Sequence, residues 1–391
     1  MPVNIALFFR LTFLQIFRAR GTNIQFNGQR RKAMLVWYLV IPIHQLLTII
    51  SYYLDEIFFG AYRRQEIKAP VFIVGNFRSG SSLLQRLLAS DGRKFTSMNV
   101  GEIYLAPTIT QRKFWSLIRW LDKHLNKARG LRFLETRDQQ WLDTLQMHKT
   151  GLFTPDEDEG LLILIWATMF LQFVYPLMDE LPPFYRFDED MPERQRKWIM
   201  NFYKAMIRRH LYVKGGDCMY LAKSPAHSAR IDSLLEYFPD ARIIYLARNP
   251  LSLVPSVVNF FRYIWRLFGD LVDPDSLNQD VFKQIHYWYR YPVERLKLRS
   301  ADQYRIYKYA DLVNNLEELV EEIYQWLGLR INNKFRAEIF RVVEESKKFQ
   351  SDNIYTLDEL GLSEKLILEE FSDEMSYFGF KPEIETSLIP Q

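Results

Sequence analysis

One stretch of the sequence combines glycines, hydroxyl side chains and an arginine in a spacing that suits the binding of an anion. It reads FIVGNFRSGSSLLQRLLA over residues 72–89, an apolar segment followed by a glycine turn and a helical pattern. Gly75 and Gly80 allow a tight turn that brings backbone N–H groups toward an anion, and the helix N-terminus adds its dipole. The cation is Arg78, whose planar guanidinium suits a pair of phosphate or sulfate oxygens. We therefore predict that this loop binds a phosphate-like group.

The loop departs from the nucleotide-binding pattern G-x-x-x-x-G-K-[ST] at the position of the lysine. Ser81 stands there, and Ser79 and Ser82 are the neighbouring hydroxyls. In the nucleotide-binding pattern the lysine reaches the outer phosphates and the hydroxyl holds magnesium. The loop is therefore better suited to one terminal phosphate-like group than to a magnesium-bound triphosphate. A strand-to-helix turn without a ligand is the alternative interpretation.

A second candidate anion site follows the apolar segment RIIYLA at residues 242–247. Arg248 stands at the end of this predicted strand, and Ser256 lies on a helix expected to begin near Leu251. Ligands of open α/β sheets bind in the crevice at the carboxyl ends of the strands, where these two side chains could converge on an anion. An isolated arginine at such a place is more often a surface residue. Its pairing with the first loop favours a functional role.

Short apolar segments, each closed by turn residues and followed by a helical pattern, indicate strands. They are residues 71–74, 218–221 and 242–246. Repeated strand–turn–helix units predict an α/β protein with a P-loop-like three-layer fold, in which helices cover both faces of a central parallel sheet. Residues 312–327 have apolar side chains at helical spacing and end at Gly328, which suits a helix C-cap.

The first 60 residues form a basic and apolar helical segment. Residues 1–54 hold six basic side chains and no acidic one. Residues 1–20 favour a basic interfacial helix, because the arginines follow the apolar run and no cleavage pattern of a signal peptide is visible. Residues 34–54 carry no charge and are long enough to span a membrane. Polar side chains within this run leave open a span, an interfacial or re-entrant helix, and a helix packed on the body.

The composition is that of a folded protein of 391 residues, with 48% hydrophobic, 25% charged and 15% aromatic side chains. The net charge of +4 is concentrated in the N-terminal segment, which does not describe a nucleic-acid binder with a broad basic face. Cys218 is the only cysteine, so no intramolecular disulfide can form. We expect a catalytic domain at residues 61–391 and a membrane-associated segment at residues 1–60.

An acidic cluster at residues 156–159 precedes an uncharged run at residues 161–178. We expect the carboxylates to lie at a solvated helix N-terminus rather than to bind a metal or a cationic acceptor. The uncharged run is at the short limit for a membrane span, so a core helix or an apolar substrate wall is the preferred interpretation. The histidines show no zinc-binding spacing such as H-E-x-x-H, and we expect no metal.

The two anion motifs together resemble the sulfotransferases that use 3'-phosphoadenosine 5'-phosphosulfate (PAPS). Residues 70–91 are similar to the 5'-phosphosulfate loop of that family, most closely to the RSGTT-type loop of its bacterial-like and tyrosylprotein branches. Residues 220–256 resemble the second signature, in which an arginine and a serine eight residues later bind the 3'-phosphate. Those positions are Arg248 and Ser256. The resemblance covers roughly residues 68–380.

The resemblance implies a sulfotransferase that moves a sulfuryl group from PAPS, as co-substrate, to a hydroxyl acceptor such as a lipid, a glycan or a small molecule. Glu102 follows a glycine, as does the catalytic glutamate of the tyrosylprotein branch. His227 is the competing candidate for the base, because an imidazole has a suitable pKa at neutral pH. Lys223 matches the family's lysine near the bridging oxygen. The loop residues implied to bind the co-substrate are Arg78, Ser79, Gly80, Ser81 and Ser82.

Two rival functions remain at the level of sequence. One is a P-loop kinase or nucleotidase, which the missing lysine disfavours. The other is an inactive, membrane-anchored binding protein of the same fold. The aromatic and basic N-terminus favours a membrane surface, a cytoplasmic catalytic domain and a lipid or glycolipid acceptor.

Overall fold

The protein is described by a computed structural model that covers residues 1–391 except residues 2, 145–149, 216, 349–355 and 384–391. Its centre is a sheet of five parallel strands in the order β2-β3-β1-β4-β5. The central strand pairs with both neighbours, so that Val71 lies opposite Leu221 of β3 and Arg242 of β4. The strands are β1 (Val71–Gly75), β2 (Phe95–Thr96), β3 (Met219–Lys223), β4 (Arg242–Ala247) and β5 (Tyr304–Lys308).

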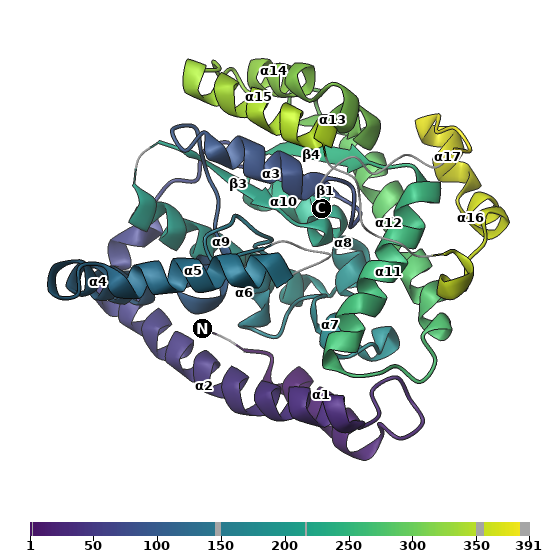
Figure 1. The fold of residues 1–391 in the computed structure, drawn as a ribbon, viewed down its shortest axis with the longest axis horizontal. Helices are drawn as coiled ribbons and strands as arrows, with labels where there is room; N and C mark the ends of the chain where they lie inside the picture. Colours follow the sequence, from purple (N-terminus) through teal and green to yellow (C-terminus); the bar gives the residue numbers. More distant parts are fainter. Residues whose placement is uncertain (2, 145–149, 216, 349–355, 384–391) are drawn as a thin grey trace.

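Helices cover both faces of this sheet, as the sequence predicts (Figure 1). Side chains of β1 alternate between two cores because successive side chains of a strand point to opposite faces. Val71 and Ile73 belong to the core beneath α3 (Ser81–Ser90), α13 (Tyr309–Asn314), α14 (Leu316–Trp326) and α15 (Asn333–Lys348). The opposite face is covered by α9 (Glu193–Lys214), α10 (Ile231–Tyr237), α11 (Pro250–Phe268) and α12 (Asn278–Leu296).

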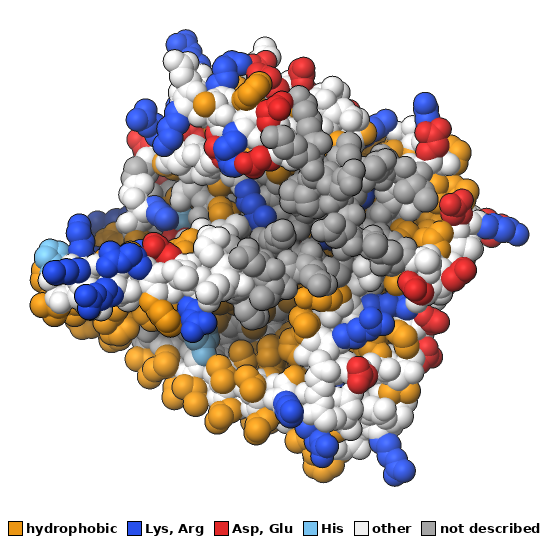
Figure 2. Space-filling view, viewed as in Figure 1, with side chains coloured by type: hydrophobic (Ala, Val, Ile, Leu, Met, Phe, Trp, Pro, Cys, Tyr) orange, Lys and Arg blue, Asp and Glu red, His pale blue; other side chains and the backbone are white. Residues whose placement is uncertain are grey.

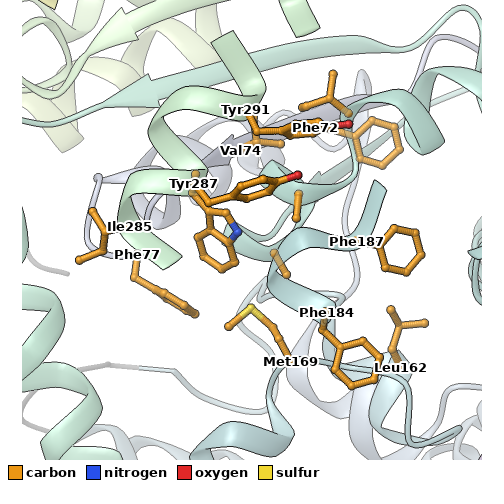
Figure 3. Packing of buried hydrophobic residues seen from close by; sticks show 14 of the residues in the cluster. Phe72, Val74, Phe77, Leu162, Met169, Phe184, Phe187, Ile285, Tyr287 and Tyr291 are labelled. Carbon is orange, nitrogen blue, oxygen red and sulfur yellow. The ribbon is translucent and has the colours of Figure 1, made fainter. Parts of the chain in front are cut away.

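The larger core is rich in aromatic rings. Phe72 and Val74 of β1 lie there together with Tyr287 and Tyr291 of α12 (Figure 3). Buried rings of this kind remove a large apolar area from water and account for much of the aromatic content. Beyond α12, short helices α16 (Glu364–Glu370) and α17 (Ser372–Phe378) close the edge of this core.

The N-terminal helices α1 (Ile5–Phe17) and α2 (Gly28–Phe58) lie along one edge of the molecule (Figure 1). Leu7, Leu11 and Met34 join the larger core, so the inner sides of both helices pack on the catalytic body. The helix α2 is long and apolar enough, by length and composition alone, to cross a membrane. The helical hairpin of α4 (Ile109–Leu125) and α5 (Arg129–Thr144) follows at the far end of α2.

Two helix predictions are wrong in detail. The run at residues 161–178 is no continuous core helix: it holds only the short turns α6 (Gly160–Ile163) and α7 (Leu171–Val174) and the 3₁₀ turn that begins at Met178. Between the first two, Trp166 adopts a φ of 56°, a left-handed conformation that ends a right-handed helix. The predicted helix at residues 312–327 is divided into α13 and α14, because Asn315 leaves the helical region with a φ of −133°.

Candidate functional site

The glycine loop joins β1 to α3 at the carboxyl end of the sheet. Two of its residues adopt the left-handed conformation, Arg78 with a φ of 65° and Gly80 with a φ of 83°. A side chain at position 80 would also collide with α13, because its Cβ would lie 2.7 Å from Leu312 Cδ2 and 3.0 Å from the Tyr309 ring. Glycine is therefore required here by both conformation and space.

The second anion motif converges on the first, as the sequence predicts. Arg248 Nη1 donates a hydrogen bond of 2.7 Å to the backbone carbonyl oxygen of Arg78. Arg78 Nε in turn donates to Ser256 Oγ at 3.1 Å. The guanidinium of Arg248 also stacks over the Tyr309 ring, 4.3 Å from its centroid. Two arginines from distant parts of the chain thus meet at the start of α3.

Buried donors at this point have no protein partner among the described residues. Neither Arg248 Nε nor Ser79 Oγ has a hydrogen-bond partner there, although both residues are almost fully buried. A buried polar atom without a partner costs free energy unless a ligand or water satisfies it. The arrangement of Arg78, Arg248, Ser79 and Ser256 therefore fits an anionic ligand such as the phosphate groups of PAPS.

A cavity of about 230 Å³ opens beside the loop. Its polar side is formed by the start of α3 and by the segment that holds the acidic cluster, and its remaining walls are aromatic and aliphatic. The volume suits a sulfuryl group and the end of an acceptor rather than a whole nucleotide. The lining residues are Phe77, Arg78, Gly80, Ser81, Ser82, Leu83, Tyr104, Asp156, Glu157, Phe170, Phe173, Pro225, Phe260 and Ile264.

Lys223, at the end of β3, forms an ion pair with Glu157, which lines this cavity. Its Nζ lies 2.5 Å from Glu157 Oε1, and the two side chains are 1% and 14% exposed. A buried ammonium needs such a partner, because an isolated buried charge is strongly unfavourable. The pair places one positive and one negative group next to the loop that the sequence predicts to bind the sulfuryl donor.

The expectation of a solvated acidic helix N-terminus at residues 156–159 is wrong. Asp158 and Glu159 are buried, at 1% and 0% exposure. Glu159 forms an ion pair with Arg230, and Asp158 accepts hydrogen bonds from the hydroxyls of Tyr203 and Tyr220. The segment turns inward because a buried arginine and two buried tyrosine hydroxyls bind its carboxylates. Of its four acidic residues, Asp156 and Glu157 line the cavity.

His227 lies in the network around Asp158 and outside the cavity lining. Its Nε2 lies 3.2 Å from Asp158 Oδ1 and 3.1 Å from the Tyr203 hydroxyl. Burial, followed by the charge of Asp158, raises the pKa values of Tyr203 and Tyr220 well above their usual range. The two phenols therefore stay protonated and remain hydrogen-bond donors to Asp158.

Glu102 lies in a separate polar cluster. Its carboxylate is 3.2 Å from Lys214 Nζ and 3.7 Å from Arg112 Nη1, and it is absent from the cavity lining. Burial, followed by the charges of Arg112 and Lys214, holds the pKa of His210 well below its usual range. His210 is therefore neutral, and Arg112 Nη1 donates to its Nδ1 at 2.9 Å. The structure thus brings Arg78, Arg248 and Ser256 into contact and pairs Lys223 with a carboxylate of the cavity, whereas neither Glu102 nor His227 lines that cavity.

A family model described as "Sulfotransferase family" matches residues 70–333, which is more than half of the chain. The chain belongs to the sulfotransferase family. Its predicted activity is thereby confirmed: the protein is an enzyme that transfers a sulfuryl group from PAPS to a hydroxyl acceptor. The match supports neither the kinase nor the nucleotidase alternative, and it does not decide the branch of the family.

Relatives and solved structures agree with this family. The sulfotransferase is 26% identical, over 75% of its own length and 72% of theirs, to proteins of Mycobacterium bovis and Mycobacterium tuberculosis named omega-hydroxy-beta-dihydromenaquinone-9 sulfotransferase. Its fold is similar to the crystal structure of sulfotransferase STF9 from Mycobacterium avium, with a TM-score of 0.68 at 15% identity and coverage of 99% and 98% of the two chains. Sulfotransferase STF1 from Mycobacterium tuberculosis gives a TM-score of 0.67 at 16% identity, covering 94% and 92%.

The sulfotransferase shows no group of three His, Cys, Asp or Glu side chains suited to a metal ion in the part of the chain that the structure describes. Sequence reasoning missed the carboxylates that line the cavity, whereas an apolar substrate wall was one of its two interpretations of residues 161–178, and Phe170 and Phe173 of that run do line the cavity. The only local signal of the carboxylates is the acidic PDEDE segment followed by an uncharged aromatic run. Nothing in that pattern alone shows that Glu157 meets Lys223, 66 residues away.

Proposed function

We propose that the sulfotransferase transfers the sulfuryl group to the hydroxyl of an apolar, lipid-like alcohol. The observation that carries this proposal is the cavity itself. The PAPS loop and two carboxylates line it together with the aromatic rings of Phe77, Phe170, Phe173 and Phe260. A site that binds a hydroxyl among aromatic rings suits an alcohol on an apolar chain better than a sugar, whose many hydroxyls would lack partners there.

The donor is held at its two anionic ends by the converging motifs. Ser81 and Ser82, at the start of α3, and the backbone N–H groups of the loop would bind the 5'-phosphosulfate. Arg248 and Ser256 would bind the 3'-phosphate, in agreement with the resemblance of these positions to the family signature. Arg78 lies between them, since it contacts Ser256 and lines the cavity.

Glu157 is the group that we propose as general base, with Lys223 as its partner. The hydroxyl of the acceptor gives its proton to Glu157 as the new O–S bond forms. The bond between sulfur and the bridging phosphate oxygen breaks, and the leaving oxygen gains negative charge. The ammonium of Lys223 and the guanidinium of Arg78 stabilise that charge. Glu157 Oε1 lies 2.5 Å from Lys223 Nζ, so the proposed base and the cation that would stabilise the leaving oxygen lie side by side.

This assignment replaces the two candidates drawn from the sequence. Glu102 faces Lys214 and Arg112, and His227 faces Asp158, so each already has partners away from the cavity. A base must come within hydrogen-bond reach of the proton that it removes. Asp156 is the second carboxylate in the cavity lining, so a substitution of Asp156 serves as the control for a substitution of Glu157.

The acceptor class is also supported by the relatives. The name of the mycobacterial relatives specifies a hydroxylated menaquinone, which is a lipid with a terminal alcohol. The tyrosine in the wall, Tyr104, stays protonated, because burial and then the nearby carboxylates raise its pKa well above the usual range. Tyr104 can therefore donate a hydrogen bond to an acceptor oxygen without competing for the proton.

The enzyme is further proposed to work at a membrane, with its catalytic domain on the cytoplasmic side. Two observations support this: the length and apolar character of α2, and the exposed basic side chains Arg31 and Lys32 near its start. Basic residues beside an apolar surface are attracted by the anionic lipids of the cytoplasmic leaflet, so a body that lies on that leaflet is cytoplasmic.

The test is transfer of ³⁵S from PAPS to three acceptor pools: long-chain primary alcohols, phenols and sugars. We expect labelling of the alcohols, and a loss of at least 100-fold in Arg78→Ala. The exposed Arg341→Ala on α15 is the matched control and should leave the rate unchanged. Labelling of sugars alone would refute the lipid-like acceptor, and absence of transfer to every pool would refute the activity.

A further inference from the structure

An exposed apolar surface covers α1, α2 and α4, and we call it the apolar face. Most of the large apolar side chains that are exposed on the described molecule belong to it, and Figure 2 shows them as a band along one edge. Soluble monomers rarely expose so continuous an apolar surface, which marks a protein or membrane contact. Its members include Phe9, Phe13, Phe17, Leu35, Leu39, Ile43, Leu46, Ile50, Ile57, Phe58, Phe114, Trp115 and Trp120.

The helix α2 turns its polar side chains toward the protein and its apolar ones outward. Exposed apolar residues recur every three or four positions from Leu35 to Phe58, which is the spacing of one helix face. On the opposite face Gln45 Nε2 donates to the Leu164 carbonyl oxygen at 2.7 Å, and Thr48 Oγ1 accepts from Gln111 at 3.1 Å. Gln45 and Thr48, two of the polar residues in the middle of this segment, are therefore contacts with the catalytic body.

Asp55 fixes the far end of α2 to that body. Its carboxylate is fully buried and lies 2.9 Å from Arg209 Nε, and it accepts hydrogen bonds from the backbone N–H groups of Ile109 and Thr110 at the start of α4. A helix that left the body to stand across a bilayer would lose this ion pair together with the contacts of Gln45 and Thr48.

Basic side chains border the apolar face at both ends of α2. Arg31 and Lys32 are exposed near its start, and Arg63 and Arg64 are exposed just beyond its end. Within described residues 1–60 the only carboxylates are Asp55, which is buried, and Glu56, whose side chain is 20% exposed and paired with Arg209. The border is thus positive, which complements the negative headgroups of an anionic leaflet.

One helix links the apolar face to the cavity. Ser256, at the donor site, and Phe260 and Ile264, in the cavity wall, lie on α11. The last residues of the same helix, Leu267 and Phe268, border an apolar groove against α2. From Ser256 to Phe268 the axis rises by about 18 Å. The hydroxyl of an acceptor whose apolar chain lies against α2 could therefore reach the cavity.

We propose that the apolar face lies in the plane of one anionic leaflet, with α1, α2 and α4 immersed on their outer sides and no helix crossing the bilayer. The acceptor then reaches the cavity along α11 from that leaflet. Only the acceptor route in this proposal rests on the proposed function. The mode of membrane binding rests on the buried contacts of Gln45, Thr48 and Asp55 and on the basic side chains that border the apolar face.

The first experiment is flotation of the full chain with preformed vesicles. We expect at least tenfold stronger binding to vesicles with 30% phosphatidylglycerol than to pure phosphatidylcholine. The double variant Leu39→Glu/Leu46→Glu should bind at least tenfold more weakly. Phe340→Glu, an equally exposed position on α15 at the opposite edge of the molecule, is the matched control and should bind as the wild type does. Equal binding by the double variant would overturn the proposal.

The second experiment separates an in-plane helix from a span. In a Cys218→Ser background, Leu39→Cys and Ile50→Cys receive a fluorescent label whose depth is read by spin-labelled lipids. In the plane of a leaflet the two labels lie at equal depth, whereas in a span they differ by about 16 Å along the helix axis. Labels whose depths differ by that amount would contradict the proposal. A dimer in solution that the double substitution dissociates, with vesicle binding unchanged, would contradict it as well.

A failure of folding or of the proposed function gives a different pattern. The double variant should bind 3',5'-adenosine diphosphate with unchanged affinity and should sulfate a short soluble alcohol at the wild-type rate. Only its activity toward a vesicle-borne long-chain alcohol should fall, by at least tenfold. If the wild type sulfates no alcohol but still shows equal label depths, the proposed function fails and the in-plane contact stands.

Discussion

Substitution of Gly80 by alanine tests the close contact between the glycine loop and α13. An alanine Cβ would lie 2.7 Å from Leu312 Cδ2 and 3.0 Å from the Tyr309 ring, and the residue would keep a φ of 83°. Gly21→Ala is the matched control, because Gly21 has a φ of 78° and no atom within 4 Å of a new Cβ. Both variants pay the cost of a left-handed alanine, about 1–2 kcal/mol. Gly80→Ala should lose about 1–3 kcal/mol more through overpacking.

The free energy of unfolding of both variants is measured by urea denaturation, and donor-site affinity by calorimetric titration with 3',5'-adenosine diphosphate. Because the Tyr309 ring also supports Arg248, we expect Gly80→Ala to weaken that affinity at least tenfold, while Gly21→Ala leaves it unchanged. Equal destabilisation by the two substitutions, with equal affinities, would refute the contact between loop and α13.

Three further predictions concern single side chains. Arg248→Lys keeps the charge but loses the planar guanidinium group. The Kd for 3',5'-adenosine diphosphate, measured by calorimetry, should rise about 10- to 100-fold, while the KM for the acceptor stays unchanged. An unchanged Kd would exclude Arg248 from the donor site. Asp55→Asn should lower the free energy of unfolding by about 1.5–3 kcal/mol in urea, because Arg209 keeps Glu56 but loses its charged hydrogen bond with Asp55. An unchanged free energy of unfolding would show that this contact does not fix α2 to the body. The lowered pKa of His210 means that the unfolded chain binds an extra proton below about pH 6.5. The free energy of unfolding should therefore fall as the pH drops, by up to about 1.4 kcal/mol per pH unit. His210→Gln should remove that slope, and an unchanged slope in urea titrations at pH 5–7 would contradict the prediction.

The two anion motifs could be predicted because each is encoded within a few neighbouring residues. A glycine turn after an apolar strand, with Arg78 beside it, defines its own geometry, and parallel strands bring their carboxyl ends to one edge. Arg248 and Ser256 therefore had to lie near the first loop. The contact of Arg248 with the Arg78 backbone shows how close these motifs come.

The acidic side of the cavity could not be predicted, because it depends on partners far away in the sequence. Glu157 turns toward Lys223 and Glu159 toward Arg230, and both cations are fully buried and in need of a carboxylate. Propensity for a helix N-terminus was overridden by these buried charges. The packing of α2 on the body depends likewise on Asp55 and Arg209, which are 154 residues apart.

The role of Glu157 as the base is tested most directly by the rate of a single turnover in Glu157→Gln, compared with Asp156→Asn and Glu102→Gln. For an aliphatic alcohol we expect a loss of about 100- to 10,000-fold in Glu157→Gln and less than tenfold in the other two. For an acidic phenol, which gives up its proton readily, the loss in Glu157→Gln should be much smaller. A large loss in Glu102→Gln with a normal rate in Glu157→Gln would contradict the assignment of the base and the place of the reaction.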